Sequence, residues 1–400
     1  MPSKADAFEK RVHRRITGRI QSFFAVTAPG LEALCRQEVL ALPVAREKVR
    51  TEKGGVLFQG KVHDCYRANL LLRTASRVLM RITDFKATNF RQLQKKIQDI
   101  EWELYFLPDT AVQVHVAVKH SRLFHTDAVR SYFQDAVELR LDKYHPAQSR
   151  SQKGGVPQSL YIRIVDDMVT VSVDSSGEVL YKRGLKSHSS RAPVRETIAA
   201  AVLKLAGYTG DTVLVDPMCG SGTFSLEGAM IANCIPAGWY RGFAFEGWPC
   251  FRPVMWNHIR QEASEKIVSP RHTMIHASDI DEPACQRLNH AISTHDLQQT
   301  VSVCARDFFS LSKMDFLPAE GSGGYGIVAI NPPYGMRIGN PDDSQDLLRR
   351  ILDQLFQAFS GWKFALTVPQ TMIRKMPCPE WEIHPVFHGG INLAIVLGRA

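Results

Sequence analysis

Two stretches of this chain carry residue types that could do chemistry at the end of a strand. The first, VLVDPMCGSGTFSLEGAMIA (residues 213–232), reads as a buried strand, a turn and a helix. Gly220 and Gly222 allow a tight turn and a close approach of the backbone to a ligand. Asp216 precedes them, and its charge would repel a pyrophosphate but suits a ligand with an amino group. The stretch matches neither the P-loop pattern GxxxxGKS/T nor GxGxxG.

Acidic residues also follow the next two predicted strands. Asp279 ends the strand MIHASD, where a carboxylate commonly accepts from ribose hydroxyls, and Asp281 is placed to cap the next helix. Asp307 ends VSVCARD and could accept from an adenine amino group, while Phe308 could flank the ring. An aspartate at such a turn is most often only a helix cap. In series at consecutive strand ends, these residues predict a site for a nucleoside with a charged amino-acid tail, such as S-adenosylmethionine (SAM).

The second stretch, GIVAINPPYG (residues 326–335), ends another strand abruptly. Its two prolines stiffen the loop and hold the Asn331 side chain and the Pro332 carbonyl in place. Those two acceptors could bind both hydrogens of an exocyclic amine on a nucleobase, and Tyr334 could stack on the base. The amine lone pair is delocalised into the ring, so positioning matters more than a strong general base. The alternative interpretation is a rigid turn without a chemical role.

Composition excludes several classes of protein. The 400 residues are ordinary globular in content, 44% apolar and 22% charged, and no apolar run is long enough to span a bilayer. A net charge of +9 favours an anionic partner such as nucleic acid. The eight cysteines form no CxxC pair and no cluster with histidine at zinc spacing, so we expect reduced thiols, no metal and a cytoplasmic protein. The oligomeric state stays open.

Four segments are expected along the chain. Residues 1–21 read as a basic, solvated tail, and residues 22–176 as a region of small α+β units that closes with a hairpin around Asp166 and Asp167. Lys119 and Arg122 lie at a strand-to-helix junction in this region and are candidate phosphate contacts, although a solvated turn fits almost as well. Residues 177–194 read as a linker and 195–400 as a catalytic domain. No metal ligands are assigned.

Strands and helices alternate in residues 195–400 in the manner of a doubly wound, mostly parallel sheet. In that architecture ligands bind at the carboxyl ends of strands, where both stretches described above lie. Between the first two strands, PAGWYRGFAFEGWPCFRPVMWNHIR (residues 236–260) is rich in aromatic residues. We expect it to be a structural lid on the catalytic sheet, or else a platform for a base flipped out of its stack.

The combination of DPMCGSGT with NPPYG resembles class I methyltransferases that act on a base amine. VDSSGEVLYKRG, with APVRETIAAAVL, resembles the linker and entry helix of bacterial large-subunit rRNA guanine-N2 methyltransferases of the RlmL type. FFAVTAPGLEALCRQEV, GGVLFQG and YRANLLLRTASRVLMRI resemble their ferredoxin-like and THUMP RNA-binding region. The resemblance covers residue 22 to the end. Some members carry a second methyltransferase domain, which residues up to Ala400 do not include.

The resemblance implies a Rossmann-like class I methyltransferase domain after a ferredoxin-like/THUMP region, with SAM as cofactor. It implies a catalytic loop made by four residues, Asn331, Pro332, Pro333 and Tyr334. It implies a cofactor site made by Asp216, Pro217, Met218, Cys219, Gly220, Ser221, Gly222, Thr223, Asp279, Ile280, Asp307 and Phe308.

The expected reaction is methyl transfer from SAM to the exocyclic N2 of a guanine in RNA, with 23S rRNA as the substrate. A tRNA guanine-N2 methyltransferase with the same domains is the alternative. Methylation of adenine N6 or of a protein glutamine would share the NPPY chemistry. From another class, a non-catalytic RNA-binding ribosome assembly factor is the third hypothesis, and the intact loops at both strand ends argue against it.

Overall fold

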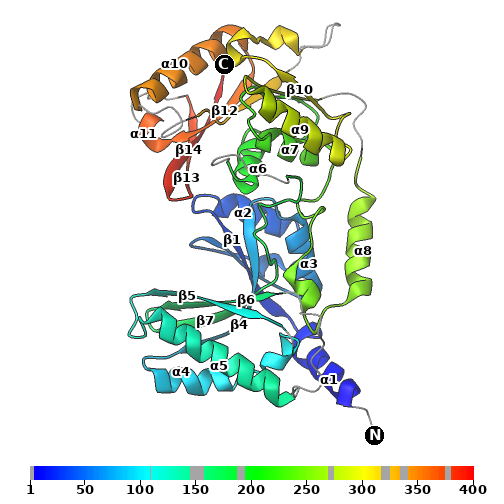
Figure 1. Cartoon of the computed structure of the whole chain (residues 1–400), viewed down its shortest axis with the longest axis vertical. Helices are drawn as coiled ribbons and strands as arrows, with labels where there is room; N and C mark the ends of the chain where they lie inside the picture. The colour runs from blue at the N-terminus through cyan, green and yellow to red at the C-terminus, as the bar shows by residue number, and fades with distance from the viewer. Residues whose placement is uncertain are drawn as a thin grey trace. The chain divides into compact units, whose positions relative to one another are not determined.

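The computed structural model describes residues 4–108, 110–144, 157–186, 194–268, 274–316, 325–333, 341–373 and 380–400. They form two compact units (Figure 1). The first unit comprises Met1–Thr27, Cys35–Leu180 and Arg241–Gln261, and the second comprises Ala28–Leu34, Tyr181–Tyr240 and Glu262–Ala400. Within the described ranges, no helix combines the length and the apolar character that crossing a bilayer requires.

The first unit is built on a seven-stranded sheet in the order β2-β3-β1-β4-β7-β6-β5. The long strand β4 joins its two halves, because it pairs antiparallel with β1 on one side and with β7 on the other. The β6–β7 hairpin turns at Asp166 and Asp167, both with positive φ, which confirms the predicted hairpin. The strands are β1 (Gln21–Thr27), β2 (Arg50–Glu52), β3 (Gly55–Gly60), β4 (Ala75–Lys86), β5 (Val112–Lys119), β6 (Gln158–Val165) and β7 (Met168–Asp174).

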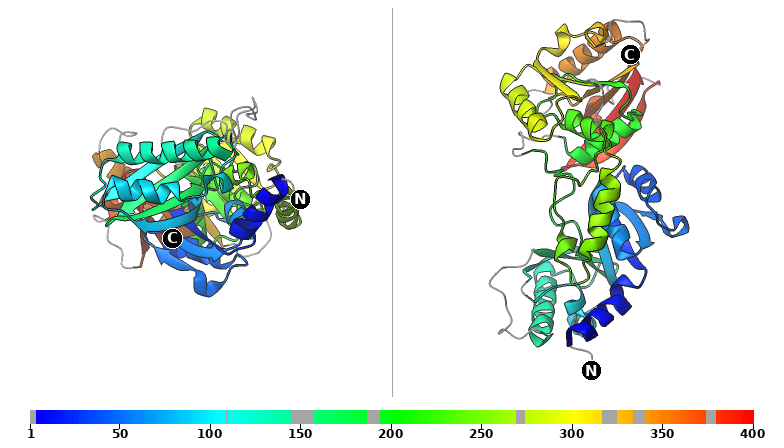
Figure 2. Two further views of the ribbon diagram at one scale, coloured as in Figure 1. Left: turned by 90° about the horizontal axis from the view of Figure 1, so that it is seen from below. Right: turned by 90° about the vertical axis from the view of Figure 1, so that its right-hand side faces the viewer.

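Helices α4 and α5 lie side by side in this unit, as Figure 1 and Figure 2 show. Trp102 and Phe133 are fully buried and meet edge to face beneath α5. The helices are α1 (Lys4–Val12), α3 (Val62–Leu71), α4 (Phe90–Gln98) and α5 (Thr126–Tyr144), with short turns η1 (His13–Thr17), η2 (Arg46–Lys48), η3 (Trp102–Leu104) and η5 (Ala244–Gly247). Two further helices, α2 (Glu32–Leu40) and α8 (Pro253–Ser264), contain residues of both units.

The N-terminal residues differ from the expected solvated tail. α1 and η1 bury Val12 and Ile16, and the Arg11 guanidinium pairs with the buried carboxylate of Glu103. Arg140 from α5 reaches the same carboxylate with two hydrogen bonds of 2.8 and 2.9 Å. The basic residues of this segment therefore belong partly to a folded ion-pair cluster, because a buried carboxylate needs cationic partners.

The aromatic segment is divided between the units: Trp239 and Tyr240 pack against the core of the second unit, as expected, whereas residues 241–261 belong to the first unit. Tyr66 of α3 stacks on Phe245 with ring centroids 4.4 Å apart, and Trp256 meets both rings edge-on. Gln158 of β6 donates to the Ala244 carbonyl at 2.8 Å. These rings are buried against their own unit, and hence they offer no open platform for a base.

The second unit contains a seven-stranded sheet in the order β10-β9-β8-β11-β12-β14-β13. Its first five strands are parallel, and β14 runs antiparallel to both neighbours. From β8 the next strands, β9 and β10, are added on one side, and β11 and β12 are added on the other side. Doubly wound sheets bind ligands where the order switches in this way, here between β8 and β11. The strands are β8 (Val213–Asp216), β9 (Ile275–Asp279), β10 (Val301–Ala305), β11 (Gly326–Ile330), β12 (Lys363–Pro369), β13 (Glu382–His388) and β14 (Ile391–Arg399).

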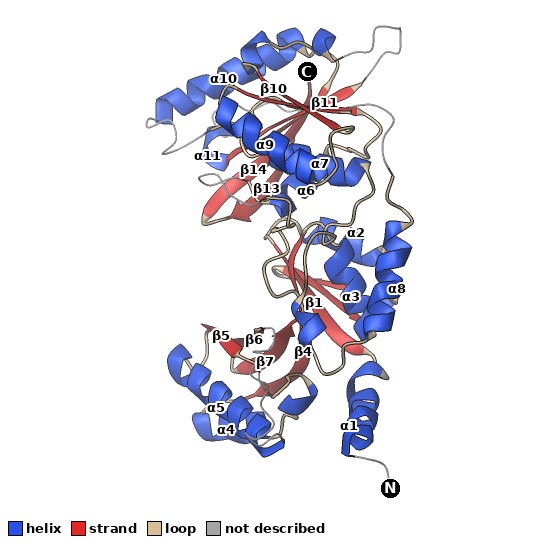
Figure 3. Ribbon diagram, turned by 45° about the vertical axis from the view of Figure 1, so that its right-hand side comes forward, coloured by secondary structure: helices blue, strands red, loops and turns tan. Residues whose placement is uncertain are grey.

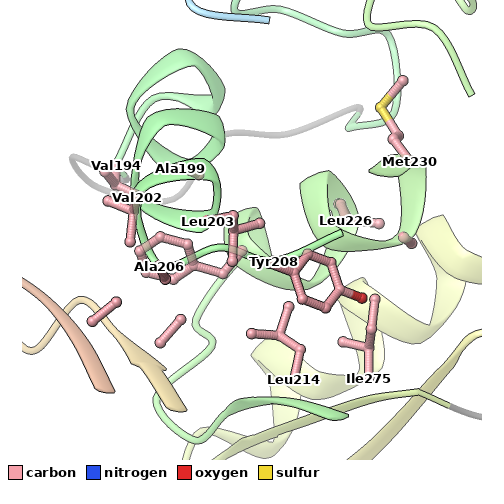
Figure 4. Packing of buried hydrophobic residues seen from close by; sticks show 14 of the residues in the cluster. Val194, Ala199, Val202, Leu203, Ala206, Tyr208, Leu214, Leu226, Met230 and Ile275 are labelled. Carbon is pink, nitrogen blue, oxygen red and sulfur yellow. The ribbon is translucent and has the colours of Figure 1, made fainter. Parts of the chain in front are cut away.

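Successive residues of the central strands face opposite layers of helices. Leu214 and Ile327 join the core beneath α6, α7 and α9, whereas Val215 and Val328 join the core beneath α10. Figure 3 shows these helices around the sheet, and Figure 4 shows the first core from close by. The helices are α6 (Glu196–Leu205), α7 (Thr223–Ala232), α9 (Glu282–Thr294), α10 (Pro341–Ala358) and α11 (Gln370–Ile373), with turns η6 (Phe308–Ser310) and η7 (Lys313–Asp315). The predicted doubly wound fold is thus confirmed.

Candidate cofactor and catalytic site

The glycine loop joins β8 to α7 by a turn that only glycine adopts easily. Gly220 and Gly222 have φ of 51° and 71°, in the left-handed region, and the Gly222 N–H donates to the Cys219 carbonyl at 2.7 Å. A Cβ on Gly222 would lie 2.3 Å from Leu288 of α9, whereas a Cβ on Gly220 would meet nothing within 4 Å. Gly222 is therefore needed for packing, and Gly220 borders open space where a ligand can approach.

Asp216 is fully buried at the tip of β8 and anchors this loop. Its Oδ2 accepts hydrogen bonds from the Ser225 hydroxyl at 2.7 Å and from the Ser225 N–H at 3.2 Å. Its Oδ1 is buried and has no hydrogen-bond partner among the residues that the structure describes. Burial raises the pKa of Asp216 to about 7. One carboxylate oxygen thus fixes the turn, and the other can accept from a bound donor such as an ammonium group.

Asp279 ties the tip of β9 to the glycine loop. Its Oδ2 accepts from the Gly220 N–H at 2.8 Å, and its Oδ1 accepts from the Asp281 N–H at 2.9 Å. Asp281 caps α9 as predicted, accepting from the Ala284 N–H. Between the two acids, Ile280 leaves 79% of its surface exposed. An apolar side chain held open at a strand tip is well suited to lie against a flat apolar ligand surface.

At the tip of β10 the structure differs from the expected site in the position of Phe308. Asp307 caps η6, because its carboxylate accepts from the Phe309 N–H at 3.0 Å. Its side chain stays exposed to solvent. Phe308, by contrast, is buried in the core beneath α10 and stacks on Phe359 with centroids 6.0 Å apart. Because its ring is already packed on its own unit, Phe308 cannot flank a cofactor ring.

The tip of β11 carries the second stretch. β11 lies beside β8 with Val328 paired to Val215, so Asn331 and Asp216 end adjacent parallel strands. The Asn331 Oδ1 atom is buried and accepts no hydrogen bond from any residue in the described part of the chain. Pro332 is buried and Pro333 is half-buried, while Tyr334 lies outside the described residues. The structure therefore places two buried acceptors at neighbouring strand ends, neither of which has a hydrogen-bond partner among the described residues.

Lys186 is a member of the site that the sequence did not single out. Its ammonium group donates to the Thr223 hydroxyl at 2.8 Å, lies 3.4 Å from the Ser221 hydroxyl and pairs with Glu196 at 3.1 Å. Residues 181–186, read from the sequence as part of a linker, belong to the second unit. The basic run LYKRGLK was the available signal, but only the fold shows what it contacts.

The fold and the strand-end site define a class I methyltransferase, and the comparison with known proteins agrees. Residues 183–394 match the model of RMKL-like methyltransferase domains, and residues 22–79 match the model of the RlmL ferredoxin-like domain. The chain belongs to the RMKL-like methyltransferase family. This confirms the resemblance inferred from DPMCGSGT and NPPYG, and the ferredoxin-like start of the first unit.

Two curated relatives indicate how far the similarity extends. A protein of Synechocystis sp., provisionally named an RNA methyltransferase, is 32% identical over 94% of this chain and 95% of its own length. A ribosomal RNA large subunit methyltransferase K/L of Syntrophotalea carbinolica is 31% identical over 94% of this chain. The match covers 53% of that protein, so the chain spans about half the length of this second relative.

Solved structures share the fold over almost the whole chain. One, provisionally described as a methyltransferase and complexed with SAH, has a TM-score of 0.82 and 25% identity, covering 96% of this chain and 98% of that one. A predicted N6-adenine-specific DNA methylase of Listeria monocytogenes has a TM-score of 0.81 and 26% identity, covering 95% and 96%. SAH is the product that remains when SAM gives up its methyl group. The predicted cofactor class is thereby confirmed for this family.

The residues at the strand ends fit SAM on observations of this structure alone. Oδ1 of Asp216, which no described residue contacts by a hydrogen bond, suits the amino group of the methionine tail, and the space beside Gly220 admits the ligand close to the backbone. Asp279 and the exposed Ile280 suit the ribose and the apolar base. The described residues contain no group of three or more metal-ligating side chains that could hold an ion.

Asp216 should give two pH effects of opposite sign. Its folded pKa of about 7 lies above the ordinary 3.8, so the folded state holds the proton more tightly. Its contribution to the free energy of unfolding is full below pH 3.8 and is lost as pH rises through 7. SAH affinity should instead rise over the same range, because the ionised carboxylate binds an ammonium group better.

Denaturation and calorimetry between pH 5 and 8 test both effects, with Asp216→Asn as the control that cannot titrate; the range brackets the pKa of about 7. The charges that face Asp216 are Asp279 and Lys186. Equal pH slopes in the wild type and the variant would show that Asp216 does not titrate in this range.

Lys186→Met should weaken SAH binding roughly tenfold, because a charge-assisted hydrogen bond contributes about 1.5–3 kcal/mol and part of that orders the loop. Calorimetry on the folded variant measures the loss. Lys313→Met is the matched control, since Lys313 lies on η7 and its ammonium group donates to the Ser360 carbonyl at 2.8 Å. Equal affinities in the two variants would remove Lys186 from the site.

Proposed function

We propose that this protein transfers a methyl group from SAM to the exocyclic N2 of a guanine in RNA, with 23S rRNA as the substrate and the cytoplasm as its location. The observation that carries the proposal is the Asn331 Oδ1 atom, a buried acceptor without a partner in the described part of the chain. It ends β11 directly beside β8, whose loop forms the cofactor site. An acceptor at that place suits a substrate that brings N–H donors to the methyl donor.

The chemistry follows from the weakness of a base amine as a nucleophile. When bound, SAM supplies a methyl group on a positively charged sulfur. Asn331 Oδ1 and the Pro332 carbonyl would accept hydrogen bonds from the amine and favour a tetrahedral nitrogen. The lone pair of such a nitrogen is no longer delocalised into the ring and can attack the methyl group. The two acceptors would hold the amine nitrogen against the methyl group while the new N–C bond replaces the C–S bond, and the extra amine proton would then pass to solvent. Positioning supplies the rate enhancement, so no strong base is required.

RNA as the substrate is supported by the two relatives, one named an RNA methyltransferase and the other a large subunit rRNA methyltransferase. The net charge of +9 agrees with an anionic partner. Lys119 and Arg122 are exposed on the first unit, as phosphate contacts must be. A tRNA substrate would use the same features and is the nearest alternative.

A second candidate is methylation of adenine N6 in DNA. It is favoured by the structural relative of Listeria monocytogenes, whose description names that reaction, and NPPY suits either base amine. A non-catalytic assembly factor is disfavoured, because Asp216, Asp279 and Asn331 keep the hydrogen bonds and open acceptors that cofactor and substrate require.

Incubating the full chain with methyl-labelled SAM and separate pools of rRNA, tRNA and DNA tests the proposal. Digestion and mass spectrometry of the labelled nucleosides should give N2-methylguanosine from rRNA. Label in N2-methylguanosine from tRNA alone would change the substrate and keep the reaction. N6-methyladenine from any pool would overturn the assignment of the base, and no label in any pool would leave the assembly factor as the better hypothesis.

Removing the charges of Lys119 and Arg122 should make RNA binding less sensitive to salt. Each phosphate contact on a single strand contributes about 0.7 to the slope of log K against log salt, so the double alanine variant should lose about 1.4. Fluorescence anisotropy at several salt concentrations gives the slope. SAH affinity serves as the control and should stay unchanged. An unaltered slope would show that these residues lie outside the RNA site.

A further inference from the structure

One edge of the first sheet carries exposed cations at the ends of two strands, β4 and β5. Lys86 ends β4 and pairs in register with Met168, the first residue of β7. Lys119 ends β5 and pairs with Val165, the last residue of β6. The chain ends of β4 and β5 and the β6–β7 turn therefore share one edge, from which Lys86 and Lys119 project into solvent.

The loop after β5 is held in one conformation at this edge. The Arg122 N–H donates to Asp167 Oδ1 at 2.8 Å, and the Asp167 N–H donates to the Ser121 hydroxyl at 3.1 Å. The same hydroxyl donates to the Lys119 carbonyl at 2.9 Å. His120 takes a left-handed φ of 48° to allow these bonds. Hydrogen bonds to the β6–β7 turn therefore order the loop, and the Asp167 carboxylate is engaged as the acceptor for the Arg122 N–H.

This ordered loop holds an aromatic ring out in water. Leu123 is buried and anchors the chain, whereas the next residue, Phe124, is 64% exposed. The Phe124 ring lies 4.1 Å from the His125 ring, centroid to centroid, at a tilt of 38°. The ordered loop therefore keeps this ring accessible beside exposed cations, an arrangement on which single-stranded nucleic acids stack their bases.

We propose that Phe124 is a stacking platform for one unpaired base of the RNA, with Lys119 and Arg122 beside it contacting the flanking phosphates. The inference rests on the proposed RNA substrate and names the part of it that this edge takes, a single-stranded segment. The occupant follows from the chemistry gathered here: an open π-face next to exposed cations matches a base next to its phosphates. A duplex would not present a base face to Phe124.

The test uses the full chain and a short single-stranded RNA oligonucleotide that carries 2-aminopurine. Phe124→Ala should weaken binding by about fivefold to a hundredfold, the range for loss of one base–aromatic stack. The loss should be the same at low and high salt, because stacking releases no counterions. Phe124→Trp should restore binding, and 2-aminopurine fluorescence should be quenched by the wild type but not by Phe124→Ala.

Two controls make the result specific. Leu139→Ala removes another exposed apolar side chain, on α5, and should leave RNA binding unchanged. A duplex RNA of the same sequence should bind wild type and Phe124→Ala equally. Wild-type affinity in Phe124→Ala, with Arg122→Ala still weakened, would overturn the platform and keep the RNA substrate. If the wild type bound neither single-stranded nor duplex RNA, the proposed function would fail and the platform with it.

Discussion

Replacing Asn331 by alanine should lower the methyl-transfer rate by about a hundredfold or more, the usual consequence of losing an acceptor that acts mainly in the transition state. SAH and RNA binding should stay near normal. The structure gives the reason for this separation: Asn331 Oδ1 bonds to no described residue, so its removal breaks no contact within the cofactor loop. The stability of the fold should change little for the same reason.

Single-turnover assays on SAM-saturated enzyme measure this rate, and Asn331→Asp is the matched variant. Aspartate keeps an acceptor of the same size at the same place and should retain more activity than alanine. Full activity in Asn331→Ala would reduce NPPY to a structural turn. A large loss of SAH affinity would instead assign Asn331 to the cofactor site, and the base-amine chemistry would then need another residue.

Asp279→Ala should weaken SAH binding by about ten- to hundredfold, from the loss of a charge-assisted hydrogen bond of about 1.5–3 kcal/mol. The side chain has two functions in the structure. It would accept from the ribose, and it already holds the Gly220 N–H at 2.8 Å. Alanine removes both, so the glycine loop loses one of its ties to β9 as well as the ligand contact.

Calorimetry with two control variants separates these functions. Asp279→Asn keeps an oxygen for the Gly220 N–H but loses the charge, and should bind SAH with intermediate affinity. Asp281→Ala removes the neighbouring cap of α9, which contributes about 1 kcal/mol to the free energy of unfolding, without touching the ligand site. Unchanged SAH affinity in a folded Asp279→Ala variant would place the ribose elsewhere.

Much of the second unit was predictable because its central strands, β8, β11 and β12, are buried on both faces and read as apolar runs. Sequence patterns predicted the strands β8, β9, β10 and β11, and the observed order of strands puts both sequence motifs at one edge. β13 was missed, because Pro385 interrupts it and its residues are mostly exposed. Proline is tolerated there because β13 is an edge strand.

The N-terminal segment and the aromatic segment show where sequence reasoning fails. The basic residues of the first segment predicted a tail exposed to solvent, but Arg11 pairs with the buried Glu103, more than ninety positions away in the sequence. The aromatic rings of residues 241–261 pack on Tyr66, although the segment lies between two strands of the other unit in the sequence. In both cases the residue that the segment packs against or pairs with is distant along the chain, so the local sequence pattern could not predict the contact.

For the candidate site, the sequence by itself determined which residues end the strands, because a strand-to-helix turn needs glycine, proline and small polar residues at fixed places. Tertiary structure decided what each side chain faces. It left Asp216 Oδ1 and Asn331 Oδ1 without partners in the described part of the chain, turned Phe308 into the core and brought Lys186 to the glycine loop. The physical reason is that turn chemistry is local, whereas burial and hydrogen-bond pairing depend on elements that meet only when the sheet assembles.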